Sequence, residues 1–284
     1  MSIASALETL QHLRIFTGNI NSRKDLKQQH FANTSDELAT CLKLDILRHK
    51  SEDVISQVDS TCCCGSDNLR EAHCTAGGHE RKDLRVTLKV FLHEWKQEFV
   101  HEAFAVALEK LQTEHVESLI VSFPPAEDAE LGENELMENL LTIWRSMEQL
   151  VRERKVITIV DYFAFTFGAA ASRVADMDVS QLSALYDAVD IKPNVNHYNI
   201  AACCTVPPEL VQYAKERDIQ LLTHNDPLNF LPHQTIVEVL REAGGLKDSE
   251  ASRWKPKWIC KHMVIIKYRS LLINKGYIVH LTKC

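Results

Sequence analysis

Glycine-rich loops, long apolar runs and an excess of basic residues are all missing from this chain of 284 residues. Its nine glycines form no loop of the kind that holds phosphate groups in dinucleotide-binding or P-loop proteins. No apolar run approaches the ~20 residues that span a bilayer, and no basic leader opens the chain, so we expect neither a membrane segment nor a secretory signal. The net charge of −7 excludes nucleic acid and anionic membranes as expected partners, because phosphate groups bind clustered Lys and Arg.

The cysteines lack the order of a disulfide framework, since there are nine of them at irregular spacing. Such thiols stay free in a reducing compartment, and we expect a cytoplasmic protein. Cys62 to Cys64 stand near His73, Cys74 and His79, which are all metal-ligand types. Adjacent cysteines do not reproduce the two-residue gap that lets two thiolates face one zinc ion. We therefore expect no metal, and a zinc-binding or thiol-based sensor stays open as an alternative.

Strand and helix patterns alternate along most of the chain. Residues 85–92 and 118–123 have the character of strands, and a helical pattern follows each of them. The clearest unit is a strand at 195–201, a helix opened by paired prolines, and a second strand at 219–223. A crossover of this length makes the two strands parallel. We predict a (β/α)8 TIM-type barrel, with an open doubly wound sheet as the alternative.

The barrel is expected to form one domain, residues 1–284, in which residues 1–81 fit the pattern only loosely. The spacing predicts a first helix with Ile3, Leu7, Leu10 and Leu13 on one face.

A second helix is predicted to open at a capping box made by Thr34 and Glu37. Residues 49–82 lose periodicity and gather Ser, Asp, Gly and Cys, which indicates a poorly ordered loop. Near the end, a helix at 233–243 precedes short β segments at 263–268 and 276–281.

Several segments resemble one known family. They are NVNHYNIAACC from Asn194, TVPPEL from Thr205, DIQLLTHNDP from Asp218, and the Trp-x-Pro-x-Trp stretch from Trp254 to Trp258. These segments, in this order, resemble the regulatory (modifier) subunits of glutamate-cysteine ligase, which look like a degenerate branch of the aldo-keto reductase superfamily. The resemblance covers roughly Lys82 to Val279 well and implies an aldo-keto reductase-like barrel, with residues 82–284 as its confident part.

The resemblance also implies a function. A member of this family is a non-catalytic regulatory subunit that forms a heterodimer with the ligase catalytic subunit in glutathione biosynthesis. The pairing is expected to activate the ligase through better use of glutamate and weaker feedback inhibition by glutathione.

Aldo-keto reductases use a tyrosine as proton donor, with a lysine, a histidine and an aspartate around it. By resemblance, Lys89 stands at the lysine position and Ser122 at the histidine position, while the span where the tyrosine belongs, residues 19–82, contains none. The aspartate cannot be assigned from the sequence. Lys267 and Arg269 resemble the segment that clamps the cofactor phosphate. We expect no catalysis and no bound cofactor, with at most a vestigial NADPH site.

The alternative function is an NADPH-dependent aldo-keto oxidoreductase with a displaced proton donor, either Tyr162 or Tyr198. Compared with the family pattern, residues 161–173 form an unusual insertion, which is either a lineage-specific loop or retained non-coding sequence. His224 to Asp226 follow a strand at the edge where catalytic groups collect in barrels, and we interpret them as capping that strand end.

The remaining candidates concern the partner. Cys203, Cys204 and Cys260 are the candidates for a thiol link between subunits, because an exposed thiol can exchange with a partner's disulfide. Trp254 and Trp258 are either interface anchors or residues that seal one end of the barrel.

Overall fold

The computed structural model divides into two compact units. We call residues 85–226 the central unit, and residues 1–84 with 227–284 the terminal unit. The residues described are 3–52, 56–58, 61–65, 73–75, 77–124, 132–157, 172–175, 177–200, 205–227 and 229–284.

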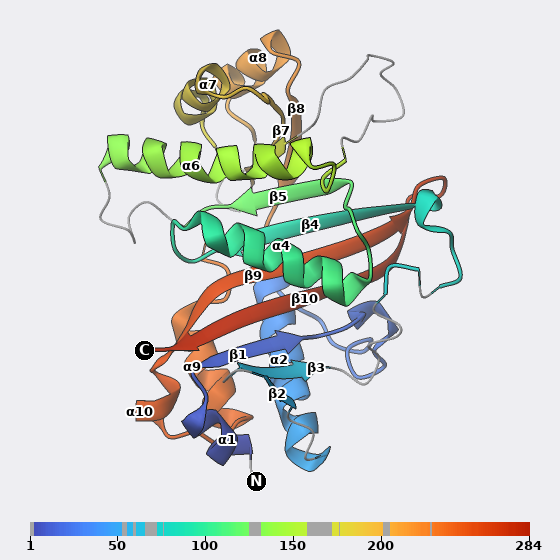
Figure 1. Ribbon diagram of the computed structural model, residues 1–284, viewed down its shortest axis with the longest axis vertical. Helices are drawn as coiled ribbons and strands as arrows, with labels where there is room; N and C mark the ends of the chain where they lie inside the picture. Colours follow the sequence, from blue (N-terminus) through green and yellow to red (C-terminus); the bar gives the residue numbers. More distant parts are fainter. Residues whose placement is uncertain are drawn as a thin grey trace. The chain divides into compact units, whose positions relative to one another are not determined.

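The central unit is built on a parallel sheet with the strand order β4-β5-β6-β7-β8. The strands are β4 (Leu84–Leu92), β5 (Ser118–Ser122), β6 (Ser172–Ala175), β7 (Pro193–Asn199) and β8 (Gln220–His224). A helix connects each strand to the next: α4 (Gln97–Leu111), α6 (Glu133–Arg152), α7 (Val179–Ala188) and α8 (Pro208–Glu216). Each helix contacts the next along the chain, as Figure 1 shows. The predicted alternation of strand and helix is therefore confirmed in this unit.

Buried side chains at helical spacing explain why these helices pack. In α4 the buried positions recur every three or four residues, from Val100 to Leu111. In α6 the carboxylate of Glu148 is buried and accepts hydrogen bonds from the backbone N–H groups of Asp190 and Ile191, at 3.0 and 2.8 Å. This contact fixes α6 to the segment that leads into β7.

The terminal unit has the strand order β2-β3-β1-β10-β9. Its long feature is an antiparallel hairpin, which Figure 1 shows beside β1. The strands are β1 (His12–Phe16), β2 (Ser56–Val58), β3 (Thr61–Gly65), β9 (Trp254–Ile266) and β10 (Leu271–Lys283). The helices are α1 (Ile3–Thr9), α2 (Thr34–Glu52), α9 (His233–Glu242) and α10 (Asp248–Ala251), with short 3-10 turns η1 (Ile20–Ser22) and η2 (Arg81–Asp83).

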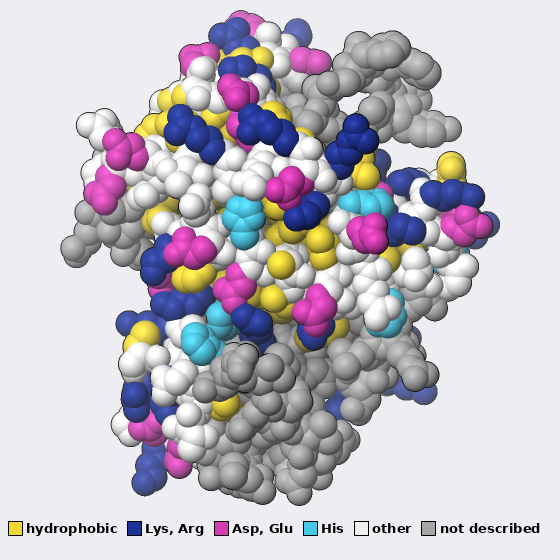
Figure 2. Space-filling view, in the orientation of Figure 1, with side chains coloured by type: hydrophobic (Ala, Val, Ile, Leu, Met, Phe, Trp, Pro, Cys, Tyr) yellow, Lys and Arg dark blue, Asp and Glu magenta, His cyan; other side chains and the backbone are white. Residues whose placement is uncertain are grey.

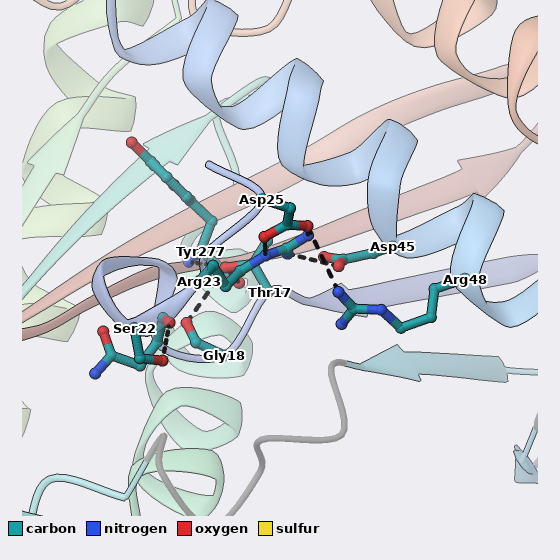
Figure 3. Close-up of polar contacts among 9 residues, drawn as sticks. Thr17, Gly18, Ser22, Arg23, Asp25, Asp45, Arg48 and Tyr277 are labelled. Carbon is teal, nitrogen blue, oxygen red and sulfur yellow. Dashed lines mark hydrogen bonds and ion pairs between the residues drawn. The ribbon is translucent and has the colours of Figure 1, made fainter. Parts of the chain in front are cut away.

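Ion pairs fix the segment between β1 and α2, as Figure 3 shows. The guanidinium of Arg23 is 2.6 Å from Asp45 in α2 and 2.9 Å from Asp25, and Arg48 approaches Asp25 from the same helix at 3.5 Å. Arg23 and Asp45 are buried, so the pair is shielded from solvent.

Several predictions about the terminal unit were wrong. The first helix ends at Thr9, and Leu13 lies in β1, where burial alternates along the strand rather than with helical period. Helix α2 begins at Thr34, as predicted, but its cap is the side chain of Asn33, which accepts hydrogen bonds from two backbone N–H groups. The expected loop at 49–82 contains the end of α2 and the short strands β2 and β3.

The C-terminal prediction was right in type and wrong in extent. Each strand of the hairpin is 13 residues long, against the short segments expected at 263–268 and 276–281. Trp254 and Trp258 are fully buried in β9, which leaves neither as an interface anchor.

The structure establishes an α/β fold with a parallel sheet, and it does not establish a complete (β/α)8 barrel. Across the described ranges, β1, β9 and β10 pair antiparallel to one another, which differs from a barrel of parallel strands. The prediction of one domain stays a prediction. In the same ranges, no helix combines the length and the apolar character that crossing a bilayer requires.

Candidate functional site

A buried ion pair lies at the carboxyl edge of the central sheet. Lys89 lies in β4 between Leu88 and Val90, neither of which is exposed to solvent. Asp226 follows the end of β8. The Nζ atom of Lys89 lies 2.8 Å from Oδ2 of Asp226, and both side chains are nearly inaccessible to solvent. Lys89 also lies 5.0 Å from the ring centre of Phe91. The positive charge of Lys89 is therefore compensated by the carboxylate of Asp226, and the aromatic face of Phe91 stabilises it further.

His224 completes this cluster. Its Nδ1 lies 3.2 Å from the backbone N of Asp226, 3.4 Å from Oδ2 of Asp226 and 3.5 Å from Nζ of Lys89. Asn199 of β7 donates to the backbone carbonyl of Asp226 at 2.9 Å. The turn after β8 is thus held from two sides.

The ion pair shows that the central sheet is strongly curved. If β4-β5-β6-β7-β8 were flat, its edge strands would be separated by about 19 Å, which is four spacings of ~4.8 Å. Instead, the side chain of Lys89 in β4 contacts the side chain of Asp226, two positions beyond the end of β8. The two edges must approach one another, as they do in the wall of a barrel.

Among the described residues, the cluster departs from the reductase pattern at the histidine position. Ser122 ends β5 opposite Phe91, and its hydroxyl cannot act as the imidazole of an active reductase does. On β7 the side chains of His197 and Asn199 face the cluster, because His197 contacts the ring of His224 and Asn199 bonds to Asp226. Tyr198 lies between them in the strand, so its side chain points to the opposite face. The alternative donor Tyr162 lies outside the described residues.

Asp226 has a contact that the sequence did not predict. We interpreted the stretch from His224 to Asp226 as a strand cap, and the aspartate of the reductase pattern could not be assigned. The structure gives Asp226 a second role as the counter-ion of Lys89. An acidic residue directly after a parallel strand was the available signal, but the sequence does not show which lysine it faces.

The two phosphate-clamp candidates lie at the turn of the hairpin in the terminal unit. Lys267 donates from Nζ to the backbone carbonyl of Lys82 at 2.8 Å, and its backbone N–H bonds to Asp83 at 2.9 Å. Arg269 lies on the same turn, where its side chain is exposed. A role in phosphate binding stays a prediction.

Of the three thiol candidates, Cys260 lies among the described residues. Cys203 and Cys204 lie outside the described residues, as does most of the insertion at 161–173. Cys260 lies in β9 with no solvent exposure, and burial raises the pKa of its thiol to about 12. A protonated thiol in the interior cannot attack a partner's disulfide, which argues against a link at this position.

The described surface carries charges of both signs. Figure 2 shows Lys and Arg side chains interleaved with Asp and Glu over the described part of the viewed face. Mixed charge of this kind does not favour a polyanion. Within the ranges given above, no group of three or more His, Cys, Asp or Glu side chains could hold a metal ion. The side chains of Cys62 to Cys64 are not among those described.

Comparison with known proteins gives one clear relationship. The chain is 31% identical over 270 residues to the glutamate–cysteine ligase regulatory subunits of Homo sapiens and Mus musculus, covering 94% of this chain and 91% of each relative. A putative regulatory subunit from Schizosaccharomyces pombe is 24% identical over 182 residues, 59% of this chain and 58% of the relative. No protein-family model matches the chain.

Solved structures give a weaker likeness. An aldo-keto reductase from Brucella melitensis has a TM-score of 0.40 and 19% identity, covering 63% of this chain and 62% of its own. An aldose reductase from Giardia lamblia has a TM-score of 0.38 and 23% identity, covering 54% and 52%. A likeness of this extent supports no conclusion about the chain.

Proposed function

Because the chain belongs to the family of glutamate–cysteine ligase regulatory subunits, we propose that it binds the catalytic subunit of that ligase and raises its activity. The observation that carries this proposal is the 31% identity over 94% of the chain. The match is spread along nearly the whole length, so it is not limited to one shared motif. The proposed assembly is a heterodimer that acts in glutathione biosynthesis in the cytoplasm.

In this proposal the chain has no catalytic activity of its own. The buried lysine of the central unit, Lys89, is bound to Asp226, and the position of the reductase histidine holds Ser122. These features support a scaffold that has kept the lysine and lost the proton donor.

Activation follows from differential binding. If the chain binds more tightly to the catalytic-subunit conformation that uses glutamate well and binds glutathione poorly, it shifts the population toward that conformation. The KM for glutamate falls and the inhibition constant for glutathione rises.

The test is to co-purify the chain with the catalytic subunit and to measure the ligase rate against glutamate concentration with and without it. We expect a complex and a lower KM for glutamate. Identical ligase kinetics with and without the chain would contradict the proposal. Carbonyl turnover by the isolated chain with NADPH at an ordinary enzymic rate would instead support the oxidoreductase alternative.

A further inference from the structure

The turn that joins β9 to β10 exposes large apolar side chains. Tyr268 is 78% exposed, Leu271 is 52% exposed and Leu272 is 38% exposed. Where Figure 1 places this turn, hydrophobic, basic and acidic side chains lie together at the right-hand edge of Figure 2. An apolar group rimmed by charge is typical of a surface that contacts another protein. We call residues 267–272 the hairpin turn.

The hairpin turn is fixed by hydrogen bonds. The backbone N–H of Arg269 bonds to the carbonyl of Ile266 at 3.3 Å, and Leu271 pairs with Ile266 across the strands. Lys267 bonds to η2 through its backbone N–H and through Nζ. A turn held in this way loses little conformational entropy when it binds, because its backbone is already ordered.

The charge at the hairpin turn is opposite to that of the chain. Lys267 and Arg269 lie on the turn itself, and η2 beside it adds Arg81 and Lys82. The acidic side chains of this region are Asp83 in η2 and Glu80, whose carboxylate pairs with Lys82. Basic side chains therefore outnumber acidic ones at this place, whereas the whole chain carries −7.

We propose that the hairpin turn docks on the ligase catalytic subunit, in an apolar depression lined by acidic side chains. This inference rests on the proposed function and adds the place of contact. Tyr268 supplies the aromatic anchor that interface hot spots favour, and Leu271 and Leu272 extend the apolar contact. The cations complement the acidic rim and raise the association rate.

The hairpin turn is a hot spot and not the whole interface. A stable complex buries about 800 Å² on each partner, which is more than one turn provides. Flatter surface around the turn supplies the remaining area, and truncation there costs little affinity.

The test measures the dissociation constant of the full chain and the catalytic subunit by calorimetry. Tyr268→Ala is expected to weaken binding at least tenfold, because it removes the anchor. Arg269→Glu is expected to weaken binding and to make it less sensitive to salt, because it removes an attraction to acidic groups. Val211→Ala is the matched control, since Val211 is 46% exposed on α8 of the central unit. Its dissociation constant should stay within twofold of the wild type.

The possible outcomes separate this inference from the proposed function. If the wild type binds and Tyr268→Ala and Arg269→Glu bind equally well while keeping the wild-type circular dichroism spectrum, the docking inference fails and the proposed function stands. If the wild type does not bind the catalytic subunit, both fail. A chain that dimerises through the hairpin turn, shown by sedimentation and abolished by Tyr268→Ala, would overturn the inference in favour of a second copy as the occupant.

Discussion

Lys89 forms a buried ion pair in the central unit. Its ammonium group is buried, and its charge is compensated mainly by the carboxylate of Asp226 at 2.8 Å. Removal of either partner leaves a charge buried without a counter-ion, which is costly, whereas the removal of both leaves an apolar site. The pair thus has a structural role that does not depend on catalysis.

The substitution Lys89→Met is expected to lower the free energy of unfolding by about 3–5 kcal/mol, because it strands the buried Asp226 carboxylate. Urea denaturation measures this. The double variant Lys89→Met with Asp226→Leu should recover much of the loss. Lys43→Met is the control, since Lys43 pairs with Glu242 at 2.9 Å on the surface, and its stability should match the wild type. If Lys89→Met were as stable as Lys43→Met, the structural role of the Lys89–Asp226 pair would be contradicted.

A second residue gives the terminal unit a sensitivity to acid. His262 has no solvent exposure, and burial lowers the pKa of its imidazole to about 4, against a smaller opposing effect of the hydrogen bond to Asn274. The unfolded chain therefore binds more protons than the folded chain between pH 6.5 and pH 4. Stability must fall as the pH falls through that window.

Replacing His262 with Gln is expected to reduce the loss of stability between pH 7 and pH 4 by about 3 kcal/mol, because the unfolded state no longer gains that proton. Urea denaturation at a series of pH values gives the slope. His233→Gln changes an exposed histidine of α9 and serves as the control. An unchanged slope in the His262 variant would show that the imidazole is not buried in solution.

At the scale of elements, a close approach joins β10 to the segment after β1. Gly276 lies in β10, and a Cβ built on it would collide with the backbone carbonyl of Gly18 and lie 2.6 Å from Cε1 of His262. A backbone atom cannot move aside as a flexible side chain can. Only glycine allows the strands to keep this register.

We expect Gly276→Ala to destabilise the terminal unit by about 3 kcal/mol, since the new methyl group forces the backbone apart. The melting temperature from circular dichroism measures the effect. Gly132→Ala is the comparison, because a Cβ at Gly132 meets nothing within 4 Å, and its melting temperature should change much less. Similar melting temperatures for the two variants would contradict the close approach.

At the scale of the whole molecule, the proposed regulation is a coupling between two binding events. If the chain weakens the binding of glutathione to the catalytic subunit, glutathione must weaken the binding of the chain by the same factor. This reciprocity follows from thermodynamics and holds for any structural mechanism.

The dissociation constant of the heterodimer should therefore rise as glutathione is added, by the same factor as the change in glutathione affinity. Calorimetric titration at several glutathione concentrations provides the measurement, with ophthalmic acid, which lacks the thiol, as a comparison ligand. A dissociation constant that does not depend on glutathione would rule out relief of feedback inhibition as the mechanism.

Features that depend on local pattern and on residue identity could be predicted from the amino-acid sequence. The unit from β7 through α8 to β8 follows from β-rich segments and paired prolines, which act over a few neighbouring residues. The absence of tyrosine from 19–82 and the serine at 122 are visible in the sequence directly. The family relationship also follows from the order of residues.

Contacts between residues that are distant in the sequence could not be predicted and follow from the folded chain. Lys89 and Asp226 are 137 positions apart, and the curvature of a sheet brings them into contact. The antiparallel pairing of β1 with β10 ended the first helix at Thr9, because hydrogen bonds across the sheet outweighed a short helical pattern. Cys260 is buried in β9, where it pairs with Ile278 of β10. Contacts of this kind depend on strand register and packing, which a local pattern does not contain.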